Sequence, residues 1–327
     1  MGFKRILASL ALVAGVLTET ATAAELRVIS SWDHTYPAYP LLLEQYTKNV
    51  EAASDGDIKF KISGPETVPS FEQLQPVGSG VFQLLFTHSA YHFGNTSFLM
   101  AVDGLKGDVR KWREAGLIEL VDKHYERFNV KVIFMAKPPE NSGYQIILRD
   151  PVTPAHDMNG RKIRGTQSYA GVLSMLGASP VVLPGSEIYT ALEKGVIDGA
   201  AWPVIGVINY RWNEVARYLL RPVFGAPVHS LFINLDTWKA LTPAQQSTLL
   251  EEGKKIEASW EADWLKLMKT EEAALIEKGA QITTMAPAQA EQLSAAYEEG
   301  LWDAALKKDP KDVADLKEFA KKNGLTN

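Results

Sequence analysis

The residue best suited to a chemical role is an arginine at the end of a short strand pattern. Arg164 closes the segment RKIR at residues 161–164 and is followed by Gly165 and a Thr-Gln-Ser stretch. Open α/β sheets bind ligands beyond the carboxyl ends of their strands. A guanidinium also matches a planar carboxylate through two parallel hydrogen bonds. Arg164 is therefore a candidate carboxylate-binding residue, and the alternative is an ordinary exposed arginine in a basic strand.

Two histidines four residues apart are a weaker candidate. His88 and His92 could hold a metal if they lay on a helix, but no Glu lies between them and residues 81–86 have a strand pattern. We expect them to be polar residues near a loop mouth. The glutamate pairs of residues 251–252 and 271–272 fall on a helical pattern, where we expect them to form a solvated face.

No catalytic layout accompanies these residues. The chain has no cysteine, which excludes thiol nucleophiles, iron–sulfur clusters and disulfides. It also lacks the sequence motifs of serine hydrolases, zinc proteases and P-loop enzymes. We expect a binding protein without catalysis, cofactor or resident metal. A hydrolase or lyase that uses His88 with a carboxylate is the alternative from a different class.

Length and charge limit the class of protein further. The 327 residues are enough for about two domains. Hydrophobic residues make up 46% and charged residues 22%, as in an average globular protein. The net charge of -5, without a polybasic block, argues against nucleic acid and anionic membrane surfaces as partners.

The first 23 residues have the layout of a secretory signal peptide. Lys4 and Arg5 precede an apolar run from Ile6 to Leu17, and the small residues Ala21-Thr22-Ala23 follow. This run is shorter than the roughly 20 residues that span a bilayer. We expect cleavage near Ala23 and a mature protein in the periplasm.

Strand-like and helix-like patterns alternate after the leader, which predicts an α/β fold with helices on both faces of its sheets. A Pro-Pro break at residues 138–139 separates two such sets. The strand patterns cover residues 26–30, 58–62, 81–86, 130–135, 144–148, 161–164, 181–183 and 196–201. The helical patterns cover residues 41–53, 111–127, 169–176 and 186–194.

A long helix is predicted from residue 243 to residue 279. Thr242 and Gln245 form a capping box around Pro243, and the helical pattern continues to Gly279. About 35 residues give a rod of about 50 Å, which is longer than one small domain is wide. The rod must cross both domains or project as a coiled-coil arm. Its apolar residues follow no strict heptad, which favours packing across two lobes.

Several segments together resemble one family. They are LRVISSWDHTYP near the mature N-terminus, the stretch Asp157–Pro203 with GRKIR and LGASPVVLPGSEIYTALEKGVIDG, and TWKALTP before the long helix. The chain resembles the extracytoplasmic solute-binding proteins of tripartite ATP-independent periplasmic (TRAP) transporters, the DctP-like family. The resemblance covers nearly the whole mature chain.

The resemblance implies a two-lobe Venus-flytrap fold braced by the long helix. Lobe I would comprise residues 24–143 plus about 226–265, and lobe II residues 144–225 plus about 266–327. The family pairs the arginine matching Arg164 with the carboxylate of an organic acid. It also delivers this ligand to membrane permease subunits that use an ion gradient. We expect a monomer, and a similar receptor for a sensor kinase or an ATP-driven importer is the alternative assignment.

Differences from one branch of the family bear on the ligand. The sialic-acid-binding branch has a second arginine where this chain has Gln145, an asparagine where it has Trp202, and a phenylalanine where it has Gly185. Trp202, Tyr169 and Trp32 would then offer flat apolar walls. An aromatic or hydrophobic monocarboxylate or a keto acid is the expected ligand, and a C4-dicarboxylate is the alternative.

The remaining candidates are polar residues expected at the cleft. They lie in the loop Thr87–Phe93 and near the strand that returns to lobe I. They are His88, Ser89 and Tyr91 in the loop, His229 and Asn234 near the returning strand, and the weaker pair Asp33-His34 after the first strand.

Overall fold

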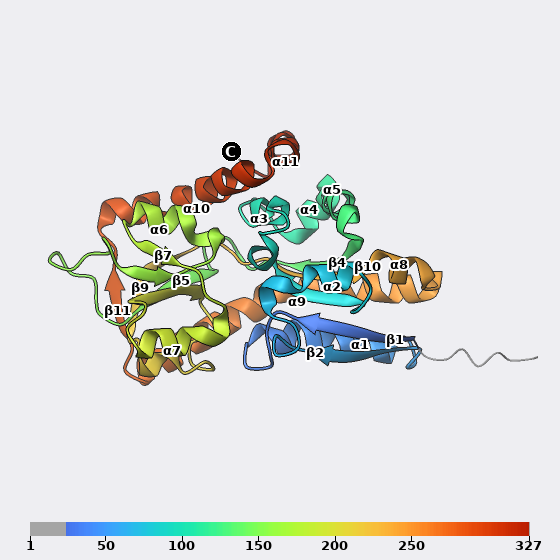
Figure 1. Cartoon of the computed structure of the whole chain (residues 1–327), viewed down its shortest axis with the longest axis horizontal. Helices are drawn as coiled ribbons and strands as arrows, with labels where there is room; N and C mark the ends of the chain where they lie inside the picture. The colour runs from blue at the N-terminus through green and yellow to red at the C-terminus, as the bar shows by residue number, and fades with distance from the viewer. Residues whose placement is uncertain (1–23, 327) are drawn as a thin grey trace, which may run out of the picture.

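The computed structural model describes residues 24–326, so the predicted signal peptide lies outside the described residues. Two separate β-sheets form the centres of two lobes, and one long helix runs behind both (Figure 1). The predicted two-lobe α/β architecture is thus confirmed.

The sheet of the first lobe has the strand order β2-β1-β3-β10-β4. Its first three strands run parallel, whereas β10 is antiparallel to both β3 and β4. A segment from far along the chain therefore completes the first lobe. The strands are β1 (Ala24–Ser30), β2 (Ile58–Ser63), β3 (Leu84–His88), β4 (Val130–Ala136) and β10 (His229–Asn234).

The sheet of the second lobe has the order β11-β9-β5-β8-β6-β7. Strand β5 lies in its centre and is antiparallel to both neighbours, while β6 is parallel to β7 and β8. The strands are β5 (Tyr144–Leu148), β6 (Lys162–Arg164), β7 (Ser179–Val181), β8 (Gly199–Pro203), β9 (Tyr218–Phe224) and β11 (Gln281–Thr284).

Helices cover the sheets on both sides. In the second lobe, α6 and α10 lie on one face and α7 on the other (Figure 1). The helices are α1 (Gln45–Ala53), α2 (Leu74–Gly78), α3 (Phe98–Val102), α4 (Val109–Ala115), α5 (Leu117–Tyr125), α6 (Ala170–Met175), α7 (Ile188–Glu193), α8 (Leu235–Ala240), α9 (Pro243–Glu277), α10 (Pro287–Lys308) and α11 (Pro310–Lys322).

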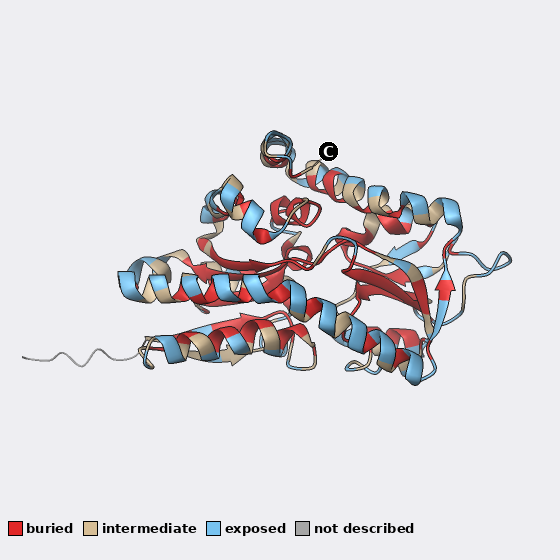
Figure 2. Ribbon diagram, turned by 180° about the vertical axis from the view of Figure 1, so that it is seen from behind, coloured by how far each residue is buried: buried red, intermediate tan, exposed pale blue. Residues whose placement is uncertain are grey.

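The long helix α9 begins as its sequence predicts. The Thr242 side chain accepts from the Gln245 backbone N–H, and the Gln245 side chain accepts from the Thr242 N–H. One stripe of α9, including Trp260 and Trp264, is buried against the two lobes, whereas the other side faces solvent (Figure 2). The helix is therefore a brace across both lobes and not a projecting arm. The prediction of a solvated glutamate face was wrong for Glu252 and Glu271, which are buried, and Glu271 accepts from the Ile208 N–H at 2.9 Å.

Two crossing segments connect the sheets, and they meet at glycines. The Gly143 N–H donates to the Gly225 carbonyl at 2.9 Å. A Cβ at Gly143 would lie 2.6 Å from the Ala226 Cα, so no larger residue fits. Because Gly225 also has a positive φ of 57°, both crossing points require glycine.

The C-terminal helices also connect the two lobes. Helix α10 packs closely on α6, where a Cβ at Gly171 would lie 2.7 Å from the Gly300 Cα. Helix α11 packs on α3 of the first lobe. The predicted boundary assigned residues 266–327 to the second lobe as a whole, and this boundary stays a prediction.

Some element bounds differ from the sequence prediction. The helix predicted at residues 111–127 is two helices, because Gly116 between them has a φ of 84°. Strands β3 and β8 begin three residues later than predicted, and β7 begins two residues earlier. The apolar patterns of buried strands mark the presence of a strand better than its ends.

Candidate functional site

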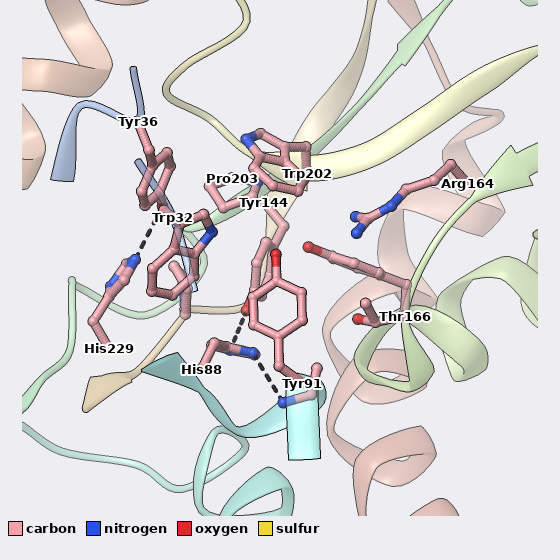
Figure 3. Close-up of a pocket in the computed structure, with 13 residues that line it drawn as sticks. Trp32, Tyr36, His88, Tyr91, Tyr144, Arg164, Thr166, Trp202, Pro203 and His229 are labelled. Atoms are coloured by element: carbon pink, nitrogen blue, oxygen red, sulfur yellow. Dashed lines mark hydrogen bonds between the residues drawn. The ribbon is translucent and has the colours of Figure 1, made fainter. Parts of the chain in front are cut away.

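A cavity between the two lobes contains most of the predicted site residues. Its volume, measured as the space open to the centre of a water molecule, is about 30 Å³. Both lobes contribute to its walls, and aromatic side chains predominate (Figure 3). The lining residues are Trp32, Tyr36, His88, Ala90, Tyr91, Tyr144, Arg164, Thr166, Tyr169, Trp202, Pro203, Pro227 and His229.

Arg164 enters this cavity from the end of β6. The residue is only 1% exposed. Its Nε donates to the Leu183 carbonyl at 2.9 Å and its Nη1 to the Ala201 carbonyl at 3.1 Å. Its buried Nη2 has no hydrogen-bond partner among the described residues, and none of their carboxylates forms an ion pair with it. A buried cation without a counter-charge is costly, so the site is prepared for an anion.

Trp202 on β8 forms the wall beside this cation. The Arg164 guanidinium carbon lies 4.9 Å from the Trp202 ring centroid, within cation–π distance. A Cβ at Gly185 would lie 2.8 Å from the Trp202 Cη2. The Trp202 ring therefore occupies the space where a larger side chain at position 185 would lie. Gly185 itself does not line the cavity.

Two tyrosines bring their hydroxyl groups towards Arg164. Tyr91 comes from the first lobe and Tyr169 from the second, and both hydroxyls lie close enough to the Arg164 guanidinium for its charge to act on them. Burial raises the pKa of both phenols, and the positive charge of Arg164 opposes this effect. Both tyrosines therefore stay protonated at neutral pH, as neutral hydrogen-bonding groups.

The first-lobe wall is an aromatic cluster around Trp32. Its ring centroid lies 5.1 Å from that of Tyr36, 5.5 Å from Tyr91 and 5.3 Å from His229. The His229 Nε2 lies 3.0 Å from the Tyr36 hydroxyl. Burial holds the pKa of His229 well below its usual 6.5, so this imidazole is neutral. The first lobe therefore presents rings and neutral polar groups to the cavity.

His88 reaches the cavity, but its two ring nitrogens contact other protein groups. The Nδ1 atom accepts from the Ala90 backbone N–H at 3.2 Å. The Nε2 atom lies 3.0 Å from both the Tyr144 hydroxyl and the Asp103 Oδ2. Ser89 Oγ donates to the same Asp103 oxygen at 2.7 Å and does not line the cavity.

Four other candidates from the sequence lie elsewhere. The Gln145 Oε1 accepts from Arg221 in a separate groove beside α9. The His92 Nε2 lies 2.6 Å from the Tyr125 hydroxyl. Asn234 caps the N-terminus of α8. Asp33 accepts from the Thr35 N–H in its own turn. None of the four lines the cavity.

Sequence reasoning missed several lining residues, above all Tyr36, Tyr144 and Thr166. Tyr36 stands in the segment DHTYP directly after the first strand, near the weaker candidates Asp33 and His34. Tyr144 is the first residue of β5, next to the candidate Gln145. The sequence therefore indicated the correct loop and the correct strand, but the predicted residues were neighbours of those that line the cavity.

Residues 24–326 contain neither a cluster of metal-ligating side chains nor a membrane-spanning helix. No group of three or more His, Asp or Glu side chains there could hold a metal ion. None of the described helices has the length and apolar character needed to cross a bilayer.

One relative is a periplasmic binding protein. The monocarboxylate 2-oxoacid-binding periplasmic protein all3028 of Nostoc sp. is 28% identical over 236 residues. This match covers 67% of the present chain and 62% of the relative, so it spans less than two thirds of that protein.

Solved structures match over nearly their whole length. A TRAP periplasmic solute-binding protein from Desulfovibrio salexigens with bound orotic acid superposes with a TM-score of 0.80 at 20% identity, covering 91% of this chain and 98% of that one. A TRAP solute-binding protein from Bordetella bronchiseptica with calcium and picolinate gives 0.79 at 23% identity, covering 92% and 91%. These likenesses show the fold.

A family model settles the classification, because it matches residues 30–309, most of the chain, including both sheets. The chain belongs to the bacterial extracellular solute-binding proteins of family 7, the DctP family.

Proposed function

We propose that this protein captures an organic monocarboxylate between its lobes and delivers it to the membrane permease subunits of a TRAP transporter. Arg164 supports this proposal most directly, because its guanidinium is buried, its Nη2 donor is unpaired and no carboxylate of the described residues forms an ion pair with it. An incoming carboxylate would supply both the missing charge and the missing acceptor.

The cavity walls favour one carboxylate over two. Of the described residues that line the cavity, Arg164 alone carries a permanent charge. A C4-dicarboxylate would bury its second charge against rings and neutral hydroxyls, which is costly. Trp32, Tyr36 and Trp202 instead provide faces for an aromatic or branched apolar group. The proposed ligand is therefore an aromatic or hydrophobic monocarboxylate or a keto acid.

Binding would close the lobes by rotation at the glycine crossing. A ligand shifts an open–closed equilibrium only if it binds the closed form better. Tyr91 and Trp32 come from the first lobe and Arg164 and Trp202 from the second, so all four contact the ligand together only when the lobes are closed. We propose the lobe boundaries given above, a monomer, and the closed form as the species that the permease recognises.

Binding without catalysis is part of this proposal. A hydrolase or lyase that uses His88 would need a free ring nitrogen, whereas both nitrogens already contact protein groups. Incubation of the protein with its tightest ligand, followed by mass spectrometry, should return the ligand unchanged. A converted product would support the enzyme.

The proposal is tested by replacing Arg164 with Met, with Lys162→Met on the same strand as the matched control. Lys162 is exposed and its side chain makes no hydrogen bond or ion pair with any described residue. A thermal-shift screen of organic acids identifies the ligand for calorimetry. We expect Arg164→Met to weaken binding by about 3–5 kcal/mol and Lys162→Met to leave it unchanged. Binding within a few-fold of wild type in Arg164→Met would refute Arg164 as the anchor.

A further inference from the structure

A hydrogen-bond chain runs from the cavity into the first lobe. It starts at the Tyr144 hydroxyl, passes through the His88 Nε2 and ends on Asp103, each step being 3.0 Å long. Asp103 is 2% exposed and also accepts from Ser89 Oγ at 2.7 Å. Tyr144 and His88 line the cavity, whereas Asp103 and Ser89 lie behind it.

The partners of His88 determine where its proton lies. The Ala90 backbone N–H can only donate, so the His88 Nδ1 must be the unprotonated acceptor. The Asp103 carboxylate can only accept, so the His88 Nε2 must carry the hydrogen. The two contacts independently require the same neutral tautomer.

This tautomer in turn orients the Tyr144 hydroxyl. The ring nitrogen nearest to it already carries a hydrogen, so the hydroxyl oxygen can accept from His88 but cannot donate to it. Among the described residues the Tyr144 hydroxyl makes no other close hydrogen bond, although the Tyr297 hydroxyl lies near enough to interact with it. Its own hydrogen is therefore available to a ligand acceptor in the cavity that Tyr144 lines, with the Tyr297 hydroxyl as a competing acceptor.

We propose that Asp103, acting through His88, holds the Tyr144 hydroxyl as a donor into the cavity and so selects ligands with a second oxygen acceptor. This inference rests on the proposed function, in which Arg164 takes the carboxylate. An oxo or hydroxy acid satisfies both groups, whereas the matching acid without that oxygen leaves a buried hydroxyl unpaired, which is unfavourable. Tyr144 is thus the specificity residue, and Asp103 and His88 are positioning residues.

The first test compares acids that differ only in one oxo group. Calorimetry measures the dissociation constants of phenylpyruvate against 3-phenylpropionate and of 4-methyl-2-oxopentanoate against 4-methylpentanoate. We expect the wild type to prefer the oxo acid by about 10- to 100-fold and Tyr144→Phe to reduce the preference to about 3-fold or less. Tyr169→Phe, which removes a hydroxyl beside Arg164, is the matched control and should weaken both members of a pair alike.

The second test addresses the positioning residues. Asp103→Asn still offers an oxygen to the His88 Nε2–H, so we expect it to keep the preference within about 3-fold of wild type. Asp103→Leu removes that acceptor and should lower the preference. A measurement that needs no variant accompanies both: nitrogen NMR of histidine-labelled wild-type protein should show His88 neutral with its hydrogen on Nε2.

The outcomes separate this inference from the proposed function. If the acids bind through Arg164 but Tyr144→Phe keeps the oxo preference, or if the His88 hydrogen lies on Nδ1, this inference is wrong and the proposed function stands. If the wild type binds none of the acids in the screen or in these pairs, or if Arg164→Met still binds them, the proposed function fails first.

Discussion

The two lobes place buried groups of opposite charge at or near the cavity between them. The second lobe contributes Arg164, a buried cation that no described carboxylate neutralises. The first lobe contributes a buried carboxylate, Asp103, whose Oδ2 contacts His88 and Ser89 and whose Oδ1 has no hydrogen-bond partner among the described residues. The difference lies in their positions: Arg164 lines the cavity, where its charge favours an anion, whereas Asp103 lies behind the wall, where its contacts fix the geometry of His88. We infer that the second lobe supplies affinity and the first lobe supplies selection.

Removing each buried charge should have opposite effects on stability. Arg164→Met removes an unpaired cation from the ligand-free protein, so its free energy of unfolding should rise by about 1–2 kcal/mol. Asp103→Leu leaves His88 and Ser89 without their acceptor and should lower it by about 2–4 kcal/mol. Urea unfolding of both variants without ligand measures this contrast. The comparison breaks down if Arg164→Met destabilises as much as Asp103→Leu.

The wall beside the cation offers a finer test of the second lobe. Gly185→Ala places a methyl group 2.8 Å from the Trp202 Cη2, so the ring must shift towards Arg164 and the ligand. We expect binding to weaken by about 1 kcal/mol, with a smaller loss for small acids than for aromatic ones. Gly94→Ala, where a Cβ would meet no atom within 4 Å, is the matched control. Equal affinities in both variants would show that Trp202 does not contact the ligand.

The regular parts of the fold were predictable because their signals are local. The strand Tyr144–Leu148 and the start of α9 have the bounds predicted from the sequence, since an apolar run and a capping box each lie within a few residues. The position of Arg164 at a strand end was local as well. The break at Gly116 was missed, because a glycine inside a helical pattern marks a possible stop and does not require one.

The contacts within the site were not predictable, because they join distant residues. Tyr36 meets His229 across 193 positions, and Tyr144 meets His88 across 56. Sequence reasoning proposed His229 and His88 as ligand-binding groups, whereas the structure pairs both with tyrosines. The need for glycine at position 185 likewise depends on Trp202, whose ring from strand β8 leaves no room for a Cβ there. Residue types therefore indicated which segments line the cavity. Which atoms remain unpaired depends on the packing of distant residues, which the sequence does not show.

The smallest expected effect is on the pH dependence of the unfolding free energy, and it comes from histidines of the first lobe. Burial lowers the pKa of His92 from 6.5 to about 3 and that of His124 to about 4. Between these pKa values and pH 6.5 the unfolded chain binds more protons than the folded one. The stability that the two neutral histidines contribute above pH 6.5 is therefore lost as the pH falls from 6.5 towards their folded pKa values. His92→Gln should therefore reduce the fall in unfolding free energy between pH 6.5 and pH 5.5 by about 1 kcal/mol. His156→Gln, at an exposed position in the second lobe, is the control. An unchanged pH dependence in His92→Gln would show that burial does not lower the pKa of His92. The loss of first-lobe stability in acid would then depend on His124 and His229.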